Sequence, residues 1–265
     1  MLKQVIIISA TIFIIVLMLL YIFQRHLMYF PARIIPRLDD YNANDLDVVS
    51  LHTSDGLVLN AWYKPAMNQR ATVLYLHGNA GHIGYRMPLA RQLINRGFGI
   101  LLVDYRGYGG NGGDPSEQGL YEDGRAGLRF LQAHGVRSQR IVLYGESIGT
   151  GVATKLAVES PICAVVLQSP FTSMTALARY HYPWLLVTPW DRFDSLGRIK
   201  AIQAPLLILH GKQDALVPYN EGVTLFEQAL EPKKMVSFAQ GDHNNLWGYK
   251  ELAEEVVHFI QTTCA

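Results

Sequence analysis

Residues 141–149, IVLYGESIG, bring a short apolar run directly into a serine that stands between two glycines. The run Ile141–Tyr144 is typical of a buried strand, and Ile148–Val158 has the length of a helix. A strand that turns at once into a helix strains the turning residue, here Ser147, and needs small neighbours such as Gly145 and Gly149. The segment predicts a sharp turn that exposes a nucleophile; a serine in an ordinary glycine-rich loop is the alternative.

The alternation of apolar runs and stretches of helical length continues on both sides of this turn. We expect strands at 71–76, 98–103, 141–144, 162–167, 205–209 and 234–238, and helices at 83–95, 116–133, 148–158, 219–230 and 246–261. Continuous apolar strands separated by helices indicate a mostly parallel sheet covered on both faces, an α/β fold. Residues 46–53 and 57–64, which flank Asp55-Gly56, predict an antiparallel strand pair.

One connection is too long for this pattern. Residues 169–201, SPFTSMTALARYHYPWLLVTPWDRFDSLGRIKA, are rich in aromatic side chains and punctuated by proline. A connection of this length between two strands predicts a small cap inserted over one end of the sheet. We expect its large side chains either to line a groove for an acyl chain or only to pack the cap on the sheet: Phe171, Tyr180, Tyr182, Trp184, Leu185 and Trp190.

The N-terminus predicts a membrane anchor. Val5–Phe23 carries no charged side chain, and as a helix it would be about 28 Å long, close to a hydrocarbon core of about 30 Å. A cleaved signal peptide is the alternative, but its apolar stretch is normally shorter and ends in small residues. We therefore expect an anchor and linker over 1–45 and a catalytic domain over 46–265. Three arginines follow the span and one lysine precedes it, which slightly favours a cytoplasmic domain and leaves the side open.

Ser147 needs a base, since a serine hydroxyl becomes a strong nucleophile only when its proton is removed. We predict His243, in QGDHNN between the last strand and the last helix, with a surface histidine as the alternative. Asp214, in HGKQDALVP after the preceding strand, is predicted to orient this base. Asp242 is a poorer candidate because neighbouring side chains in a turn rarely meet.

Polar groups follow five of the predicted strands: Asn79, Asp104, Ser147, Asp214 and His243. Ligands of open α/β sheets bind outside the carboxyl ends of the strands, so we expect these groups to gather there. Acyl transfer puts negative charge on a carbonyl oxygen, which backbone donors must stabilise. We predict the amides of Ile148 and Asn79 as this oxyanion hole; a glycine-rich HGNAG turn without chemistry is the alternative.

Charge and cysteine content exclude other classes. The formal net charge is +1, so a basic surface for nucleic acid is not expected. Cys163 and Cys264 do not have the spacing of a metal site, and no metal or organic cofactor is implied. We expect no disulfide between them, because Cys264 lies in a tail expected to fray.

Several blocks of the chain resemble a known family: YLHGNAGHIGYRMPLARQLINRGFGILLVDYRGYGG, PSEQGLYEDGRAGLRFL, IVLYGESIGTGVATKLA, SPFTSM, LLILHGKQDALVP and GDHNNLW. They resemble the membrane-associated α/β-hydrolases of the alpha/beta-hydrolase domain-containing 13 and 17 type, over nearly all of residues 46–260 and in an anchor followed by LMYFP. The resemblance implies the α/β-hydrolase fold and a serine hydrolase with Ser147, Asp214 and His243 as triad. Some relatives remove palmitate from proteins.

We therefore expect a hydrolase of ester or thioester bonds in acyl-chain substrates, such as lipids, small esters or acylated proteins, at a membrane. A peptidase of short peptides and a non-catalytic membrane-tethered binding protein are the alternatives. Glu146 departs from the family, which has a basic residue before the serine, so we expect it to alter the charge near the nucleophile. The helical span also departs from relatives held at membranes by lipidated cysteines.

Overall fold

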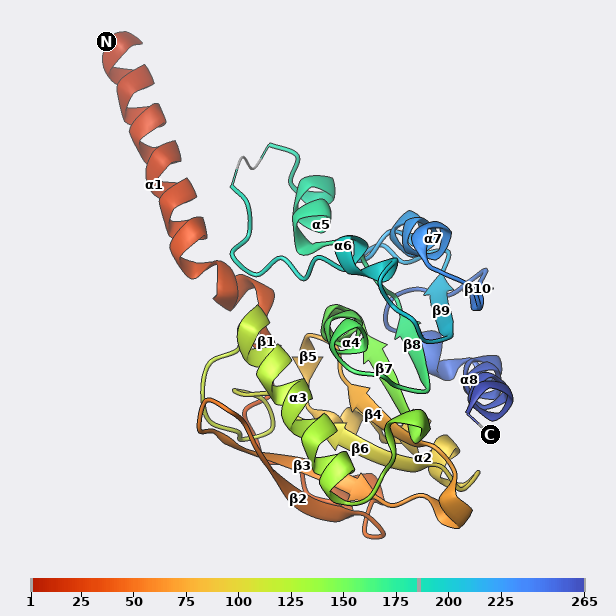
Figure 1. Cartoon of the computed structure of the whole chain (residues 1–265). Helices are drawn as coiled ribbons and strands as arrows, with labels where there is room; N and C mark the ends of the chain where they lie inside the picture. Colours follow the sequence, from red (N-terminus) through yellow and green to blue (C-terminus); the bar gives the residue numbers. More distant parts are fainter. Residues whose placement is uncertain (1, 185–186, 265) are drawn as a thin grey trace.

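The computed structural model describes residues 2–184 and 187–264, with an eight-stranded sheet at its centre (Figure 1). The strand order is β10-β9-β8-β7-β4-β6-β3-β2. The strands from β6 to β10 in this order are parallel, whereas β3 is antiparallel to both β2 and β6. Their bounds are β2 Asp47–His52, β3 Val58–Lys64, β4 Thr72–Leu76, β6 Gly99–Val103, β7 Ile141–Glu146, β8 Ala164–Gln168, β9 Leu206–Gly211 and β10 Lys233–Phe238.

Helices follow the strands much as the sequence predicts. They are α1 Leu2–Met28, α2 Met87–Ile94, α3 Glu117–Ala133, α4 Ile148–Glu159, α5 Met174–His181, α6 Leu196–Ile199, α7 Tyr219–Gln228 and α8 Lys250–Thr263. Short 3-10 helices lie at Asp39–Tyr41, Met67–Gln69, Ile83–Arg86, Ser138–Arg140 and Leu246–Gly248. The predicted helices 83–95 and 246–261 therefore each begin with a 3-10 turn. The long connection after β8 contains α5 and α6.

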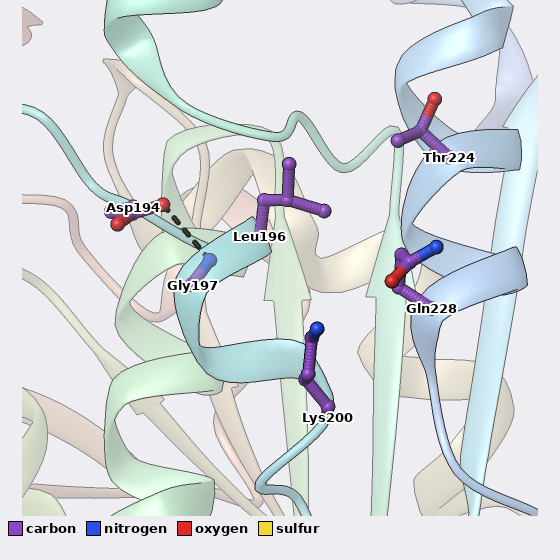
Figure 2. A pocket seen from close by; sticks show the side chains of 6 residues that line it. All are labelled: Asp194, Leu196, Gly197, Lys200, Thr224 and Gln228. Carbon is purple, nitrogen blue, oxygen red and sulfur yellow. Dashed lines mark hydrogen bonds between the residues drawn. The ribbon is translucent and has the colours of Figure 1, made fainter.

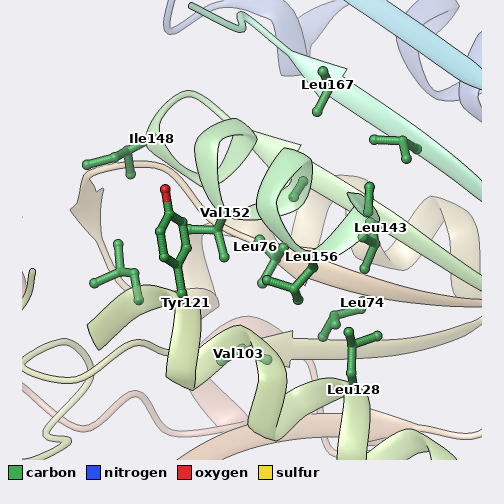
Figure 3. Close-up of a cluster of buried hydrophobic side chains, with 14 of the residues drawn as sticks. Leu74, Leu76, Val103, Tyr121, Leu128, Leu143, Ile148, Val152, Leu156 and Leu167 are labelled. Carbon is green, nitrogen blue, oxygen red and sulfur yellow. The ribbon is translucent and has the colours of Figure 1, made fainter. Parts of the chain in front are cut away.

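The sheet is buried on both faces, which explains its continuous apolar strands. Alternate strand side chains enter two different clusters. On one face, shown in Figure 3, α3 and α4 pack through Tyr121, Leu128, Val152 and Leu156 against Leu74, Leu76, Val103, Leu143 and Leu167. On the other face α2 and α8 pack against Val73, Tyr75, Ile100, Tyr144 and Val166. This doubly covered sheet holds the ends of β4, β7, β9 and β10 at one edge.

The segment after the apolar stretch is more regular than the sequence predicts. We expected a linker after the uncharged stretch that ends at Phe23, but α1 continues to Met28. Phe30–Pro31 then forms strand β1, which pairs in parallel with β5, Ala80–Gly81. The linker prediction is wrong here because these residues find backbone partners in the loop after β4, far along the chain.

Cys163 and Cys264 form a disulfide, so the prediction of unpaired cysteines is also wrong. Their Cα atoms lie 5.7 Å apart, within the range of ordinary disulfides. The C-terminal tail does not fray, because α8 buries Leu252, Val256 and Ile260 against the sheet up to its last turns. That packing brings Cys264 to the start of β8.

Reduction of this disulfide is expected to destabilise the domain. The two cysteines are 101 residues apart, and cross-links that close loops of this size are worth about 4–5 kcal/mol in the chain-entropy model. Thermal unfolding of the detergent-solubilised protein, with and without reductant, measures the effect. A Cys163→Ala/Cys264→Ala variant is the control, since its melting temperature should not respond to reductant. An unchanged melting temperature of the reduced wild type would contradict the prediction.

Candidate active site

Ser147 lies between β7 and α4 in a strained conformation, with φ 51° and ψ −117°. The turn is so tight that there is no room for a side chain at Gly145 or Gly149, two positions before and after Ser147. A Cβ on Gly145 would lie 2.6 Å from the carbonyl oxygen of Gly149, and one on Gly149 would lie 2.0 Å from the carbonyl oxygen of Leu76. The two glycines therefore let the start of α4 pack directly on the end of β4, as such a turn requires.

His243 and Asp214 meet Ser147 in one chain of hydrogen bonds. The Nδ1 of His243 lies 2.7 Å from Oδ2 of Asp214, and its Nε2 lies 3.0 Å from Oγ of Ser147. An ionised carboxylate only accepts, so Nδ1–H donates to Asp214 and Nε2 accepts the hydroxyl of Ser147. This is the tautomer that a general base needs.

The carboxylate of Asp214 is buried and held from two sides. Its Oδ1 accepts hydrogen bonds from the amides of Leu216, at 3.0 Å, and Val217, at 2.7 Å. Burial alone would raise the pKa of Asp214, but hydrogen bonds from His210 and His243 lower it below its usual range. Asp214 is therefore ionised at neutral pH, as the predicted orienting carboxylate must be.

The other histidines and aspartates at this edge have different partners. His210 Nε2 donates mainly to the carbonyl oxygen of Val217, at 2.9 Å, and lies 3.5 Å from Oδ2 of Asp214, so it supports the loop that carries Asp214. Asp104 accepts from the amide of Ile83 at 3.0 Å. Asp242 accepts from the amides of the two residues that follow His243, so it does not orient that imidazole.

The predicted oxyanion donors lie at the ends of neighbouring strands. Ile148 is the first residue of α4, where backbone N–H groups have no partner inside the helix. Asn79 follows β4, and its carbonyl oxygen accepts a hydrogen bond of 2.7 Å from the hydroxyl of Tyr108. Within the described residues, neither the amide of Asn79 nor that of Ile148 donates to a backbone carbonyl. A backbone acceptor therefore occupies neither amide, as the predicted oxyanion hole requires.

Glu146 does not bring a free negative charge to the nucleophile. Its side chain is buried and pairs with Arg86 through contacts of 3.0 Å and 3.1 Å, and it accepts from the hydroxyl of Tyr75 at 2.9 Å. Burial would raise the pKa of Glu146, but the Arg86 guanidinium and these hydrogen bonds hold it below its usual range. The expectation that Glu146 alters the charge near the nucleophile is therefore wrong, because Glu146 and Arg86 together form a neutral pair.

Arg86 is a residue that the sequence alone does not single out. Besides pairing with Glu146, its Nη1 donates to the carbonyl oxygen of Ala80 at 2.9 Å. The pair therefore ties the residue before Ser147 to the residue after Asn79, and so joins the two halves of the predicted oxyanion hole. The sequence did contain a signal for such a partner: Glu146 is acidic and ends an otherwise apolar strand. A buried carboxylate needs a cation nearby.

Arg86→Gln is expected to destabilise the protein by about 3–5 kcal/mol, because it leaves the carboxylate of Glu146 buried without its cation. The double variant Glu146→Gln/Arg86→Gln should recover part of this loss, since two amides carry no charge. Thermal or urea unfolding of the single and double variants measures both effects. Wild-type stability of Arg86→Gln would show that the pair is not needed to hold the loop.

The cap side chains do not gather into one groove. Phe171 is buried in the core with Ile148, whereas Tyr180, Tyr182, Trp184 and Trp190 are exposed. Leu185 lies outside the described residues. A surface hollow of about 520 Å³ lies elsewhere, between α6 and α7; it is lined by Asp194, Leu196, Gly197, Lys200, Thr224 and Gln228 (Figure 2). It contains none of the predicted site residues.

Known proteins match the chain over most of its length. A family model described as serine aminopeptidase, S33 matches residues 67–192. An uncharacterized protein of Mycobacterium tuberculosis strain H37Rv is 41% identical over 236 residues, which are 87% of this chain and 84% of that protein. Alpha/beta hydrolase domain-containing protein 17B of Xenopus tropicalis is 33% identical over 196 residues, or 73% of this chain and 67% of that protein.

A solved structure supports the same conclusion for the fold. The esterase Pf2001 of Pyrococcus furiosus aligns with a TM-score of 0.75 at 22% identity, over 89% of this chain and 100% of that chain. The resemblance found from the sequence blocks, and with it the fold class, is confirmed. The chain has the α/β-hydrolase fold and belongs to the α/β-hydrolase family that includes alpha/beta hydrolase domain-containing protein 17B.

Proposed function

We propose that this protein is a serine hydrolase that cleaves carboxylic ester or thioester bonds of acyl-chain substrates at a membrane. The observation that carries the proposal is the hydrogen-bond chain from Ser147 through His243 to Asp214. A serine, an imidazole and a buried carboxylate in this geometry are the parts that acyl transfer needs. A non-catalytic binding protein has no need for all three to meet at the carboxyl ends of the strands.

The first half of the reaction forms an acyl-enzyme. His243 Nε2 takes the hydroxyl proton of Ser147 while Oγ forms a bond to the acyl carbonyl carbon. The carbonyl oxygen becomes an oxyanion, which accepts hydrogen bonds from the amides of Asn79 and Ile148. When the intermediate collapses, the bond to the leaving alcohol or thiol breaks, and His243 returns the proton to it.

The second half releases the acyl group as a carboxylic acid. His243 removes a proton from water, whose oxygen attacks the acyl carbon, and the same two amides hold the second oxyanion. The bond to Oγ then breaks, and the proton on Nε2 returns to Ser147. Asp214, which stays ionised, stabilises the imidazolium in both halves.

The membrane part of the proposal rests on α1. This helix is apolar and long enough to cross a bilayer, and none of the residues in its apolar window is buried in the structure. A cleaved signal peptide fits less well, because Arg25 and Tyr29 at the end of α1 hydrogen-bond to Asp191 of the folded domain. A site held beside a bilayer suits substrates with an apolar acyl chain.

Two features of the chain indicate opposite sides of the membrane for the folded domain. The excess of arginines after the span favours the cytoplasm, but by a small margin. The disulfide favours an oxidising compartment, where such bonds persist. We infer that the domain faces the oxidising side, since the disulfide is the more specific feature. Protease digestion of intact cells tests this, and a domain protected from external protease would contradict it.

The matching family model names serine aminopeptidases, which makes a peptidase the second candidate. The same triad can attack an amide, but an aminopeptidase must also bind a protonated amine. The carboxylate adjacent to the nucleophile, Glu146, already pairs with Arg86. This arrangement favours an ester or thioester as the substrate.

A substrate series with the full chain in detergent micelles tests the proposal. It compares nitrophenyl esters from acetate to palmitate, an acyl thioester and an aminoacyl nitroanilide. We expect hydrolysis of esters or thioesters that rises with acyl-chain length and disappears in Ser147→Ala. Cleavage of the nitroanilide alone would instead support the peptidase. A folded protein that cleaves none of these and does not react with a fluorophosphonate would refute the proposal.

A further inference from the structure

Four aromatic side chains of the cap are exposed. Tyr180, Tyr182, Trp184 and Trp190 have exposed fractions of 63%, 53%, 56% and 44%; together they are called the cap face below. They lie within a stretch of eleven residues, counting from 180 to 190. Burying a large aromatic ring is strongly favourable, so several exposed rings on one loop indicate a surface that is covered in use.

The cap is fastened to the end of α1 by a buried carboxylate. Arg25 binds Asp191 with both Nε, at 2.9 Å, and Nη2, at 3.0 Å, and Tyr29 donates its hydroxyl to the same group at 3.0 Å. The backbone amide of Trp190 also donates to the side chain of Gln24 at 2.7 Å. These four hydrogen bonds fix the position of the cap relative to the helix.

These contacts set the level of the cap face along α1. The ring of Trp190 meets the ring of Tyr21 edge-on, with centroids 5.1 Å apart. Tyr21 lies close to the end of the uncharged stretch 5–23, where a spanning helix leaves the hydrocarbon. Figure 1 shows the loop after α5 rising on the same side of the molecule as α1. Tryptophan and tyrosine are enriched at this level of a membrane.

The charge of the cap suits a lipid surface as well. Residues 173–190 contain no aspartate or glutamate, but they contain Arg179 and His181. The next carboxylate, Asp191, is buried and pairs with Arg25. The stretch 173–190 can therefore approach phosphate headgroups without bringing a carboxylate of its own to them, and its Arg179 is exposed.

We propose that the cap face lies in the headgroup layer of the same bilayer that α1 spans, with a phospholipid surface as its partner. The aromatic rings replace contacts with water by contacts with lipid, and the clamp at Asp191 holds them at that depth. The proposal deepens the proposed function and rests on it in one respect: it makes the bilayer the source of the acyl chain. Binding of the cap face to lipid does not itself require catalysis.

Tryptophan fluorescence in liposomes tests this placement, because α1 contains no tryptophan. The full chain is reconstituted in phosphatidylcholine liposomes with and without bromine on the acyl chains, which quenches only tryptophans that reach the lipid. Two of the four tryptophans belong to the cap face, so we expect brominated lipid to remove up to about half of the emission. The variant Trp184→Phe/Trp190→Phe should lose almost none of its emission to brominated lipid. Its two remaining tryptophans are Trp62, which is buried, and Trp247, which packs against Arg86.

Two controls sharpen the result. Adding Val48→Trp to the double variant places an exposed tryptophan on β2, away from α1 in Figure 1, and it should stay unquenched by lipid. Ser147→Ala should be quenched like the wild type, so a failure of the proposed catalysis leaves this readout unchanged. Equal quenching of wild type and double variant, or a chain that does not float with the liposomes, would overturn the proposal.

Discussion

Ser147→Ala is expected to lower turnover of any acyl substrate by about 10⁴–10⁶-fold without unfolding the protein. Among the described residues the hydroxyl of Ser147 hydrogen-bonds only to the imidazole of His243, so its loss removes the predicted nucleophile and no other side-chain hydrogen bond. Alanine has the same Cβ as serine and adds no strain at the positive φ of this position. Hydrolysis rates and fluorophosphonate labelling of both proteins measure the effect, and circular dichroism checks the fold.

Ser160→Ala is the matched control for this experiment. Ser160 caps the other end of α4 and has no contact with the predicted triad. Labelling should therefore persist in Ser160→Ala and vanish in Ser147→Ala. If Ser147→Ala kept its label and its activity, the nucleophile would have to be a different residue, and the proposed mechanism would fail.

Asp214→Asn is expected to lower turnover by about 10⁴-fold, the cost of the wrong tautomer at a triad histidine. The carboxylate accepts from two backbone amides through Oδ1. An asparagine will keep its carbonyl oxygen there and turn its NH₂ group toward His243. Nδ1 must then accept rather than donate, which puts the ring proton on Nε2. In that state Nε2 cannot receive the proton of Ser147.

The comparison with Asp242→Asn separates the two aspartates that the sequence places near His243. Within the part of the chain that the structure describes, the side chain of Asp242 accepts only from the amides of Asn244 and Asn245, so its variant should retain activity within a few-fold. The two variants are measured side by side for initial rates and for their pH dependence. A larger loss of activity in Asp242→Asn than in Asp214→Asn would show that Asp242, and not Asp214, orients His243.

Much of the fold could be predicted because its signals are local. A doubly covered parallel strand must be apolar throughout, and each such strand lies where 71–76, 98–103 and 141–144 predicted it. The turn at Ser147 could be predicted for the same reason, since the two glycines that it requires are its own neighbours. Polar residues directly after strands, such as Asp214, then indicated which edge of the sheet carries the site.

The contacts that were missed join residues far apart in the chain. Arg86 meets Glu146 across 60 positions, and Arg25 meets Asp191 across 166. Cys163 and Cys264 meet only because α8 docks on the sheet. No periodicity or spacing records such pairings, because each depends on where two separate elements come to rest.

The sequence by itself determined the α/β class, the order of strands and helices along the chain, and the candidate residues for the proposed acyl transfer. Hydrophobic burial decides these features strand by strand, so the pattern of apolar residues carries them. Only the tertiary structure decided that His243 stands 3.0 Å from Ser147, that Glu146 is neutralised, and that the cap is clamped to α1. Those outcomes depend on the packing of segments distant in sequence, where a shift of one ångström makes or breaks a hydrogen bond.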